Sequence, residues 1–233
     1  MKKSLLVVAL LSAFAPMVAQ AEAGDIVVRL RSGFVNPDEK SKLGSVSAAN
    51  GAGALIGTDA RLTVENNVIP ELDISYYLTK NIADELILAT GTRHDVNLTS
   101  NTGAGALGGS LGNQALGSVN ILPPTLTAQW HFNPDQTIDP YFGAGVNYTH
   151  SFDRKLATTA GAPIRIDQDM FGVVAQAGVD INLGSGWLVN ADVKYVTMNT
   201  SVKVSLDSGA TWVKIDDLDI NPWIFGVGIG KKF

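Results

Sequence analysis

The 233-residue sequence contains no cysteine, few charged residues and only three histidines. The lack of cysteine excludes disulfides, thiolate metal sites and a cysteine nucleophile. Charged residues make up 17% of the chain, which is low for a soluble globular protein. The net charge is -5 and no cluster of lysine and arginine occurs, so we exclude a nucleic acid partner, because phosphate backbones bind basic patches.

Long apolar runs are also missing after the first 21 residues. No later segment has the roughly 18 consecutive apolar residues that indicate a membrane-spanning helix. Residues 1–21 have a basic start at Lys2 and Lys3, an apolar stretch, and Ala19-Gln20-Ala21 at the end. This pattern predicts a secretory signal peptide that is cleaved near Ala21, followed by a single mature domain over residues 22–233.

The mature chain is rich instead in segments where apolar residues alternate with polar residues or glycine, a period of two that is typical of β-strands. In LDISYYL, for example, Leu72, Ile74 and Tyr76 alternate with Asp73 and Ser75. Eight such segments occur, near residues 25–35, 68–78, 83–96, 122–132, 139–150, 169–183, 187–199 and 216–233.

The connections between these segments alternate in length. TKN, NPDQT and GSG are tight turns of Asn, Pro, Asp and Gly, residues that accept the backbone angles of turns. Long polar or glycine-rich loops are expected at 36–67, 97–121, 151–168 and 200–215. The sequence therefore predicts an all-β fold, an eight-stranded antiparallel transmembrane β-barrel with short periplasmic turns and four long extracellular loops.

A soluble eight-stranded barrel with an apolar interior is the alternative. Two features favour the membrane barrel. The polar strand faces carry mainly Gly, Ser, Thr, Asn and Gln, rather than the lysines and glutamates of a water-facing surface. Aromatic residues near the strand ends are typical of interfacial girdles; they are Tyr76, Tyr77, Trp130, Phe132, Trp187, Trp223 and Phe233.

The chain also ends within its last predicted strand, on Phe233. In a membrane barrel this strand must pair with the first, because an open edge in hydrocarbon would leave backbone groups without hydrogen bonds. The terminal position of Phe233 is therefore a third feature in favour of a membrane barrel.

Four segments carry a family resemblance: LPPTLTAQWHF at 122–132, IDPYFGAGVNYT at 138–149, WLVNADVKYV at 187–196 and DINPWIFGVGIGKKF at the C-terminus. They resemble the OmpW family of small outer-membrane barrels, which includes the AlkL-type importers of hydrophobic molecules. The resemblance covers the mature chain and implies a place in the lipid of a Gram-negative outer membrane. It also implies lateral release of hydrophobic cargo, and a C-terminal signal at Phe233 for the outer-membrane assembly machinery. The Gly-rich stretch SNTGAGALGGSLGNQALGSVN departs from the family pattern, so no loop residue is carried over.

An eight-stranded barrel is only wide enough inside for side chains, so an open aqueous channel is not expected. Charged residues inside a membrane barrel face the lumen and pair with one another. The charged residues at the alternate strand positions that point inward, which we call inward parity, are Arg29, Arg31, Glu71, Asp73, Arg93, Asp180, Asp192 and Lys194. We interpret them as a structural plug. Leu218, Ile220 and Ile224 have inward parity nearer the loops and predict an apolar upper lumen.

Pro123 and Pro124 stand at the head of the fourth predicted strand. Because proline has no N–H for strand pairing, they either leave the seam with the third strand locally open or merely end the second loop. An open seam predicts passive uptake of small hydrophobic or weakly polar solutes, which enter the upper lumen and leave through the wall. The alternative function is a non-transporting structural or receptor barrel whose loops bind surface ligands.

An enzyme is the less favoured class. His94, His131 and His150 are dispersed, and neither G-x-S-x-G nor H-E-x-x-H is present. Their spacing also gives no pattern of metal ligands. We therefore predict no catalytic activity, no cofactor and no metal site, and the sequence leaves the oligomeric state open.

Overall fold

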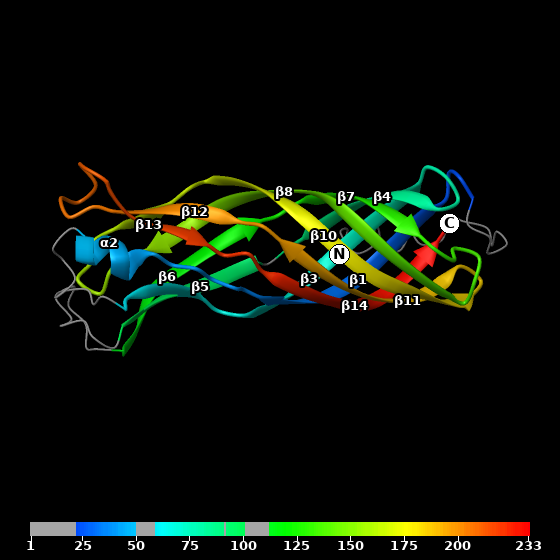
Figure 1. Ribbon diagram of the computed structural model, residues 1–233, viewed down its shortest axis with the longest axis horizontal. Coiled ribbons are helices and arrows are strands. Elements are labelled where there is room, and N and C mark those ends of the chain that lie inside the picture. Colours follow the sequence, from blue (N-terminus) through cyan, green and yellow to red (C-terminus); the bar gives the residue numbers. More distant parts are fainter. Residues whose placement is uncertain (1–21, 50–58, 91, 101–111) are drawn as a thin grey trace, which may run out of the picture.

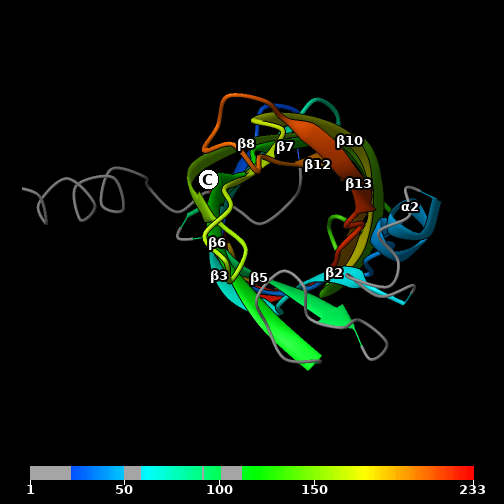
Figure 2. The ribbon, with the colours of Figure 1, turned by 90° about the vertical axis from the view of Figure 1, so that its left-hand side faces the viewer.

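The computed structural model describes residues 22–49, 59–90, 92–100 and 112–233, which form a long closed barrel (Figures 1 and 2). The predicted signal peptide, residues 1–21, lies outside the described residues. In the described ranges, the only helix, α2 (Leu43–Ala49), is too short to cross a membrane. The architecture is therefore built almost entirely from strands.

The barrel has eight antiparallel strands, as predicted: β1 (Ile26–Asn36), β3 (Asn67–Tyr77), β4 (Ile82–Ala89), β7 (Thr125–His131), β8 (Ile138–Leu156), β10 (Asp169–Gly184), β11 (Trp187–Val196) and β14 (Trp223–Lys232). Each strand pairs with the next, and β14 closes on β1. The N–H of Phe233 donates to the carbonyl of Ile26 at 2.8 Å, and the N–H of Ile26 donates back at 3.2 Å. Phe233 thus lies inside the sheet, where β14 closes on β1 and the eight strands form a ring.

Side chains alternate along the barrel strands between an inner polar face and an outer apolar face. In β3, Glu71, Asp73 and Ser75 are buried in the lumen, whereas Leu72 and Ile74 are exposed on the outer surface. An outer apolar band is what contact with lipid requires. The prediction that the apolar parity faces outward is confirmed for this strand.

Aromatic side chains lie near both ends of the outer band. Near the extracellular ends, the rings of Tyr148 and Phe171 lie 4.9 Å apart, and Tyr195 and Trp223 make a similar pair. Tyr77 was wrongly assigned to the girdle: it shares the inward parity of β3, is only 3% exposed, and its hydroxyl lies 3.2 Å from Nδ1 of His131.

The predicted loops also contain regular structure, which extends the wall beyond the membrane. These elements are β2 (Arg61–Val64), β5 (Thr92–Ser100), β6 (Gly112–Leu122), β9 (Ile164–Ile166), β12 (Asn199–Val204) and β13 (Val213–Asp219). β5 pairs with β2 and β6, and β6 pairs with the upper part of β8. β12 pairs with β9 and β13. Figure 1 places α2 beside these strands at the end of the barrel away from the C-terminus.

The predicted third strand, 83–96, is interrupted between β4 and β5. Ala89 faces the lumen at the end of β4, and Thr92 and His94 face it from β5. The inward parity therefore changes from odd to even residue numbers across the break. Arg93 consequently points outward, with its side chain 66% exposed and its Nε 3.5 Å from Asp95. Its prediction as a lumen charge was wrong for this reason.

Candidate functional site

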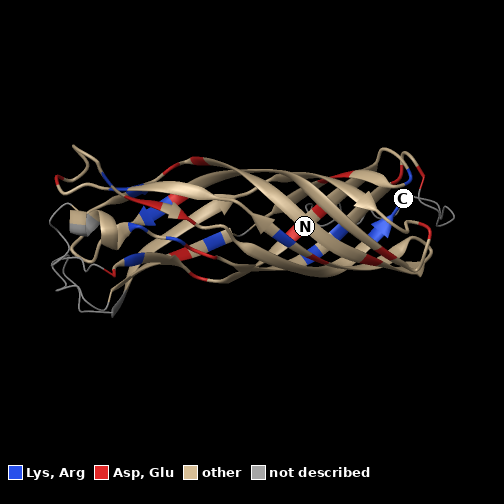
Figure 3. Ribbon diagram, in the orientation of Figure 1, with Lys and Arg blue, Asp and Glu red and all other residues tan. Residues whose placement is uncertain are grey.

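The lower lumen is filled by an ion-pair network, whose charged positions lie on the strands toward the C-terminal end in Figure 3. Arg31 is central to it. Its Nε lies 2.5 Å from Asp73 and its Nη1 lies 2.9 Å from Asp192. Its Nη2 lies 3.4 Å from Glu85, and all these side chains are fully buried. The planar guanidinium can pair with several carboxylates at once.

Arg29 and Lys194 extend the network in opposite directions along the lumen. Arg29 Nη2 lies 2.5 Å from Asp180, and its Nη1 lies 3.2 Å from Glu85. Lys194 Nζ donates a hydrogen bond to Glu71 at 2.8 Å. The structure thus brings together every predicted lumen charge except Arg93: Arg29, Arg31, Glu71, Asp73, Asp180, Asp192 and Lys194.

Glu85 is the principal residue of this network that the sequence interpretation missed. It is fully buried and contacts both arginines. Neutral side chains also contribute, because Gln129 and Gln176 donate hydrogen bonds to Glu85 at 2.8 and 2.9 Å. Glu85 has the same parity as the buried Ala83 in the same strand, so the alternation of β4 could have identified it. We call this buried polar network the floor of the lumen.

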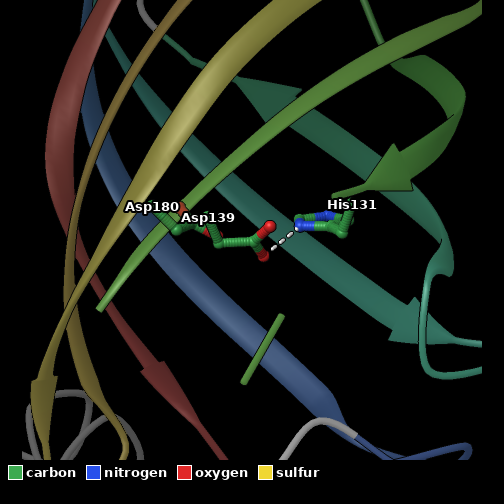
Figure 4. Close-up of side chains that lie close together, drawn as sticks. All are labelled: His131, Asp139 and Asp180. Atoms are coloured by element: carbon green, nitrogen blue, oxygen red, sulfur yellow. Dashed lines mark hydrogen bonds and ion pairs between the residues drawn. The ribbon is translucent and has the colours of Figure 1, made fainter. Parts of the chain in front are cut away.

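At the periplasmic end of the floor, His131, Asp139 and Asp180 place potential metal ligands within 4.8 Å of one another (Figure 4). Nδ1 of His131 lies 2.7 Å from Asp139, and Asp180 is paired with Arg29. A metal ion here would lie beside the guanidinium of Arg29 and compete with its ion pair, which is electrostatically unfavourable. We therefore assign these three residues to the floor rather than to a metal centre.

Above the floor, a cavity of about 80 Å³ lies among apolar side chains of the barrel extension. Leu218 and Ile220 line it, at positions where the sequence predicted an apolar upper lumen. Within the described part of the chain, His94 and Thr200 are its only polar lining residues. Such a cavity offers water few hydrogen-bond partners, whereas an apolar solute gives up no hydrogen bonds when it enters. We call it the upper cavity.

A second cavity of about 50 Å³ lies between the upper cavity and the floor; we call it the lower cavity. The two share the lining residues Val35, His94, Ile121, Met198 and Pro222. Glu71 and Lys194 of the floor border the lower cavity, and Ile224 lines it. Pro123 and Ala89 line it as well, at the boundary between the third and fourth strands.

The wall beside the lower cavity has an interval without strand pairing. The β4–β7 ladder ends at Ile87 and Thr125, and the β5–β6 ladder begins at Thr92 and Ile121. Between them, no backbone pair joins 88–90 to 122–124 in the residues that the structure describes. We call this interval the seam.

Pro123 and Pro124 occupy one side of the seam, where their missing N–H groups explain the lack of donors. The carbonyl of Pro124 accepts a hydrogen bond from the N–H of Tyr148 at 3.0 Å. The segment that leads into β7 therefore remains joined to β8. The pairing is lost only on the other side, toward β4 and β5.

The three histidines are placed in three different environments. His131 lies in the floor, His94 faces the two cavities, and His150 lies on the outer surface with Nδ1 2.7 Å from Asp169. Ser151, a hydroxyl near His150 in sequence, donates instead to the backbone carbonyl of Asp167 at 2.8 Å. His150 and Ser151 thus do not form a nucleophile and base pair of the kind that hydrolysis requires.

Comparisons with known proteins agree with this architecture. The sequence profile of the OmpW family matches residues 22–233. The chain is 34% identical over 240 residues to outer membrane protein W of Vibrio cholerae, with both chains covered completely. It is 27% identical to outer membrane protein AlkL of Ectopseudomonas oleovorans, over 78% of this chain and 73% of the relative.

The fold also matches solved outer-membrane barrels. The crystal structure of OprG from Pseudomonas aeruginosa superimposes with a TM-score of 0.74 and 27% sequence identity. The match covers 93% of this chain and 99% of that one. The outer-membrane location and the barrel fold are therefore both established by comparison.

Proposed function

The chain belongs to the OmpW family of outer-membrane proteins, and from this premise we propose that it is a channel for passive uptake of small hydrophobic or weakly polar molecules. Solutes enter the upper cavity from the extracellular side and leave sideways through the seam beside Pro123 and Pro124. The observation that carries the proposal is the place of the seam, since it borders the lower cavity directly above the closed floor.

The floor disfavours a straight route to the periplasm. A solute that moved downward would have to separate buried ion pairs such as Arg31 with Asp73. Separating one such pair costs about 3–5 kcal/mol, because a charge is left buried without its partner. The sideways route passes Ile87 and Ala89 instead, and breaks no ion pair of the floor.

The outer surface at the seam suits the release of an apolar solute. Leu122 and Leu126 flank the two prolines and are 45% and 52% exposed on the outside of the barrel. A molecule that leaves here meets an apolar surface and lipid, where burial of about 100 Å² of apolar area is worth roughly 2.5 kcal/mol relative to water. Transfer from the extracellular water to the lipid is therefore favourable, and the lateral route lets that difference drive net uptake.

The C-terminal strand supports a second proposed contact, with the outer-membrane assembly machinery. Phe233 is the last residue and completes the pairing of β14 with β1 through Ile26. A terminal strand that closes the barrel is available for recognition before closure occurs. Deletion of Phe233 is expected to lower the amount of folded barrel in the outer membrane, measured by heat-modifiable migration on gels.

The uptake proposal is tested in cells that lack the barrel and are restored with wild type or with Pro123→Ala/Pro124→Ala. The two alanines restore N–H donors to the seam. Wild type is expected to speed the uptake of a labelled apolar solute, and the double variant to reduce that gain at equal surface level and normal folding. A labelled small amino acid, tested in parallel, measures how far the route accepts polar solutes.

Equal uptake of the apolar solute with and without the barrel would refute the channel proposal. That outcome would favour the alternative, a structural or receptor barrel whose extracellular segments bind surface ligands. The two functions are thus separated by the same experiment.

A further inference from the structure

His94 has an unpaired polar atom where a solute would pass from the upper to the lower cavity. The residue lines both cavities and is 8% exposed. Its Nδ1 is buried and has no hydrogen-bond partner. Among the described residues that line either cavity, no other buried side-chain nitrogen or oxygen lacks a partner. A buried acceptor of this kind costs stability unless it serves a ligand.

The surroundings of His94 define which hydrogen-bonding role Nδ1 can take. The backbone of Glu65 lies close enough to the imidazole to raise its pKa. An effect of this sign favours a ring N–H directed toward Glu65, and because Nδ1 has no partner we place the proton on Nε2. In that tautomer Nδ1 has a free lone pair and acts as an acceptor.

Burial, the larger effect, lowers the pKa of His94 below its ordinary range. The neighbouring residues Arg93 and Asp95 are charged and exposed on the outer surface, so this part of β5 lies outside the lipid-facing band. At neutral pH the imidazole is therefore neutral and keeps its lone pair.

We propose that Nδ1 of His94 accepts a hydrogen bond from a hydroxyl or N–H group of an otherwise apolar solute. This inference rests on the proposed uptake function and narrows its substrate class to small apolar molecules that carry a hydrogen-bond donor, such as phenols and alcohols. The apolar lining of the upper cavity accommodates the hydrocarbon part, and His94 is the point at which the donor is recognised.

Thr200, the other polar residue of the upper cavity, is already engaged. Its Oγ1 accepts a hydrogen bond from the N–H of Asp167 at 3.0 Å. His94 is also the only one of the two that lines the lower cavity. We therefore assign to His94 the selection between a solute with a hydrogen-bond donor and a matched solute without one. One net hydrogen bond predicts that the barrel favours the uptake of the donor solute about fivefold.

Binding at His94 is measured by nitrogen NMR on the full barrel in lipid nanodiscs, with ¹⁵N-labelled histidine. The chain has only three histidines, so His94→Phe and His150→Phe spectra assign their signals. Phenol and toluene are the probes, because they differ by a hydroxyl in place of a methyl group. Phenol is expected to shift the Nδ1 signal of His94, and toluene to leave it in place. No shift with phenol at saturation, or the same shift with both probes, would overturn the inference.

Uptake of the two probes gives an independent readout. The phenol to toluene ratio of barrel-dependent uptake is expected to fall about fivefold in His94→Phe, and to recover partly in His94→Gln, whose carbonyl is an acceptor. His150→Phe is the matched control and should keep the wild-type ratio, because His150 lines neither cavity. An unchanged ratio in folded His94→Phe would contradict the role of His94. Uptake of neither probe would instead refute the channel proposal, whereas the NMR titration still decides whether His94 binds a donor.

Discussion

Replacement of Arg31 by alanine is expected to destabilise the barrel more than any surface arginine replacement. Arg31 is the ion-pair partner of Asp73, whose side chain is completely buried, and it also pairs with Asp192. Asp192 keeps Lys194 as a partner at 3.2 Å, but Asp73 has no other ion pair within the described residues. Arg31→Ala therefore leaves one buried carboxylate without a cation, which costs about 3–5 kcal/mol.

The matched control is Arg93→Ala. Arg93 is 66% exposed and its pair with Asp95 is a surface contact, which is worth less than about 1 kcal/mol. The free energy of unfolding is measured by urea titration in phospholipid vesicles, with the fluorescence of the four tryptophans as the signal. Arg31→Met/Asp73→Leu should recover much of the loss, because it removes the stranded charge. Equal losses for Arg31→Ala and Arg93→Ala would refute the buried network.

Two other predictions concern packing between strands and a loop carboxylate. A Cβ at Gly145 would lie 1.9 Å from the carbonyl oxygen of Leu126. Gly145→Ala should therefore lower the free energy of unfolding by about 1–3 kcal/mol in the same urea titration. An unchanged midpoint would contradict the close approach of the two strands. Hydrogen bonds from Ser205 and Thr211 lower the pKa of Asp207. The stabilisation from these hydrogen bonds should therefore persist as the pH falls through the ordinary pKa range of an aspartate, and be lost only near the lowered pKa. Carbon NMR titration should show a higher pKa for Asp207 in Thr211→Val, and the same pKa in both proteins would contradict this hydrogen bonding.

Alternation of residues was enough to predict the barrel itself, because each strand has to present one apolar face to lipid and one polar face to a narrow lumen. The same rule located Arg29, Arg31 and Asp73, which the structure brings into one network. A separate argument, that an open strand edge in hydrocarbon leaves backbone groups unpaired, predicted that the last strand closes on the first, and the pairing of Phe233 with Ile26 confirms it.

The rule failed where a strand is interrupted. Parity carried through from β4 put Arg93 in the lumen, whereas the break before Thr92 shifts the phase by one residue and turns His94 inward. A one-residue shift exchanges the two faces of a strand. The length of such a break cannot be read from a single sequence, so the shift could not be predicted.

The extracellular segments were harder to predict for a different reason. β5 and β6 pair through contacts that depend on the barrel wall below them, and β6 also uses the upper part of β8. Such long-range pairing overrides the turn-like composition of the segment. The apolar lining at Leu218 and Ile220 was predicted, but the shapes of the two cavities were not, because they depend on how side chains from six or more separate strands fit together.

The most direct test of the lateral route is uptake by a variant in which the lower cavity is filled beside the seam. Ala89 is 3% exposed and lines that cavity, whereas Ala128 faces outward in the neighbouring strand β7. Barrel-dependent uptake of labelled toluene is expected to fall strongly in Ala89→Phe and to stay at the wild-type rate in Ala128→Phe, at equal surface levels. Wild-type uptake by a correctly folded Ala89→Phe barrel would contradict passage through the seam.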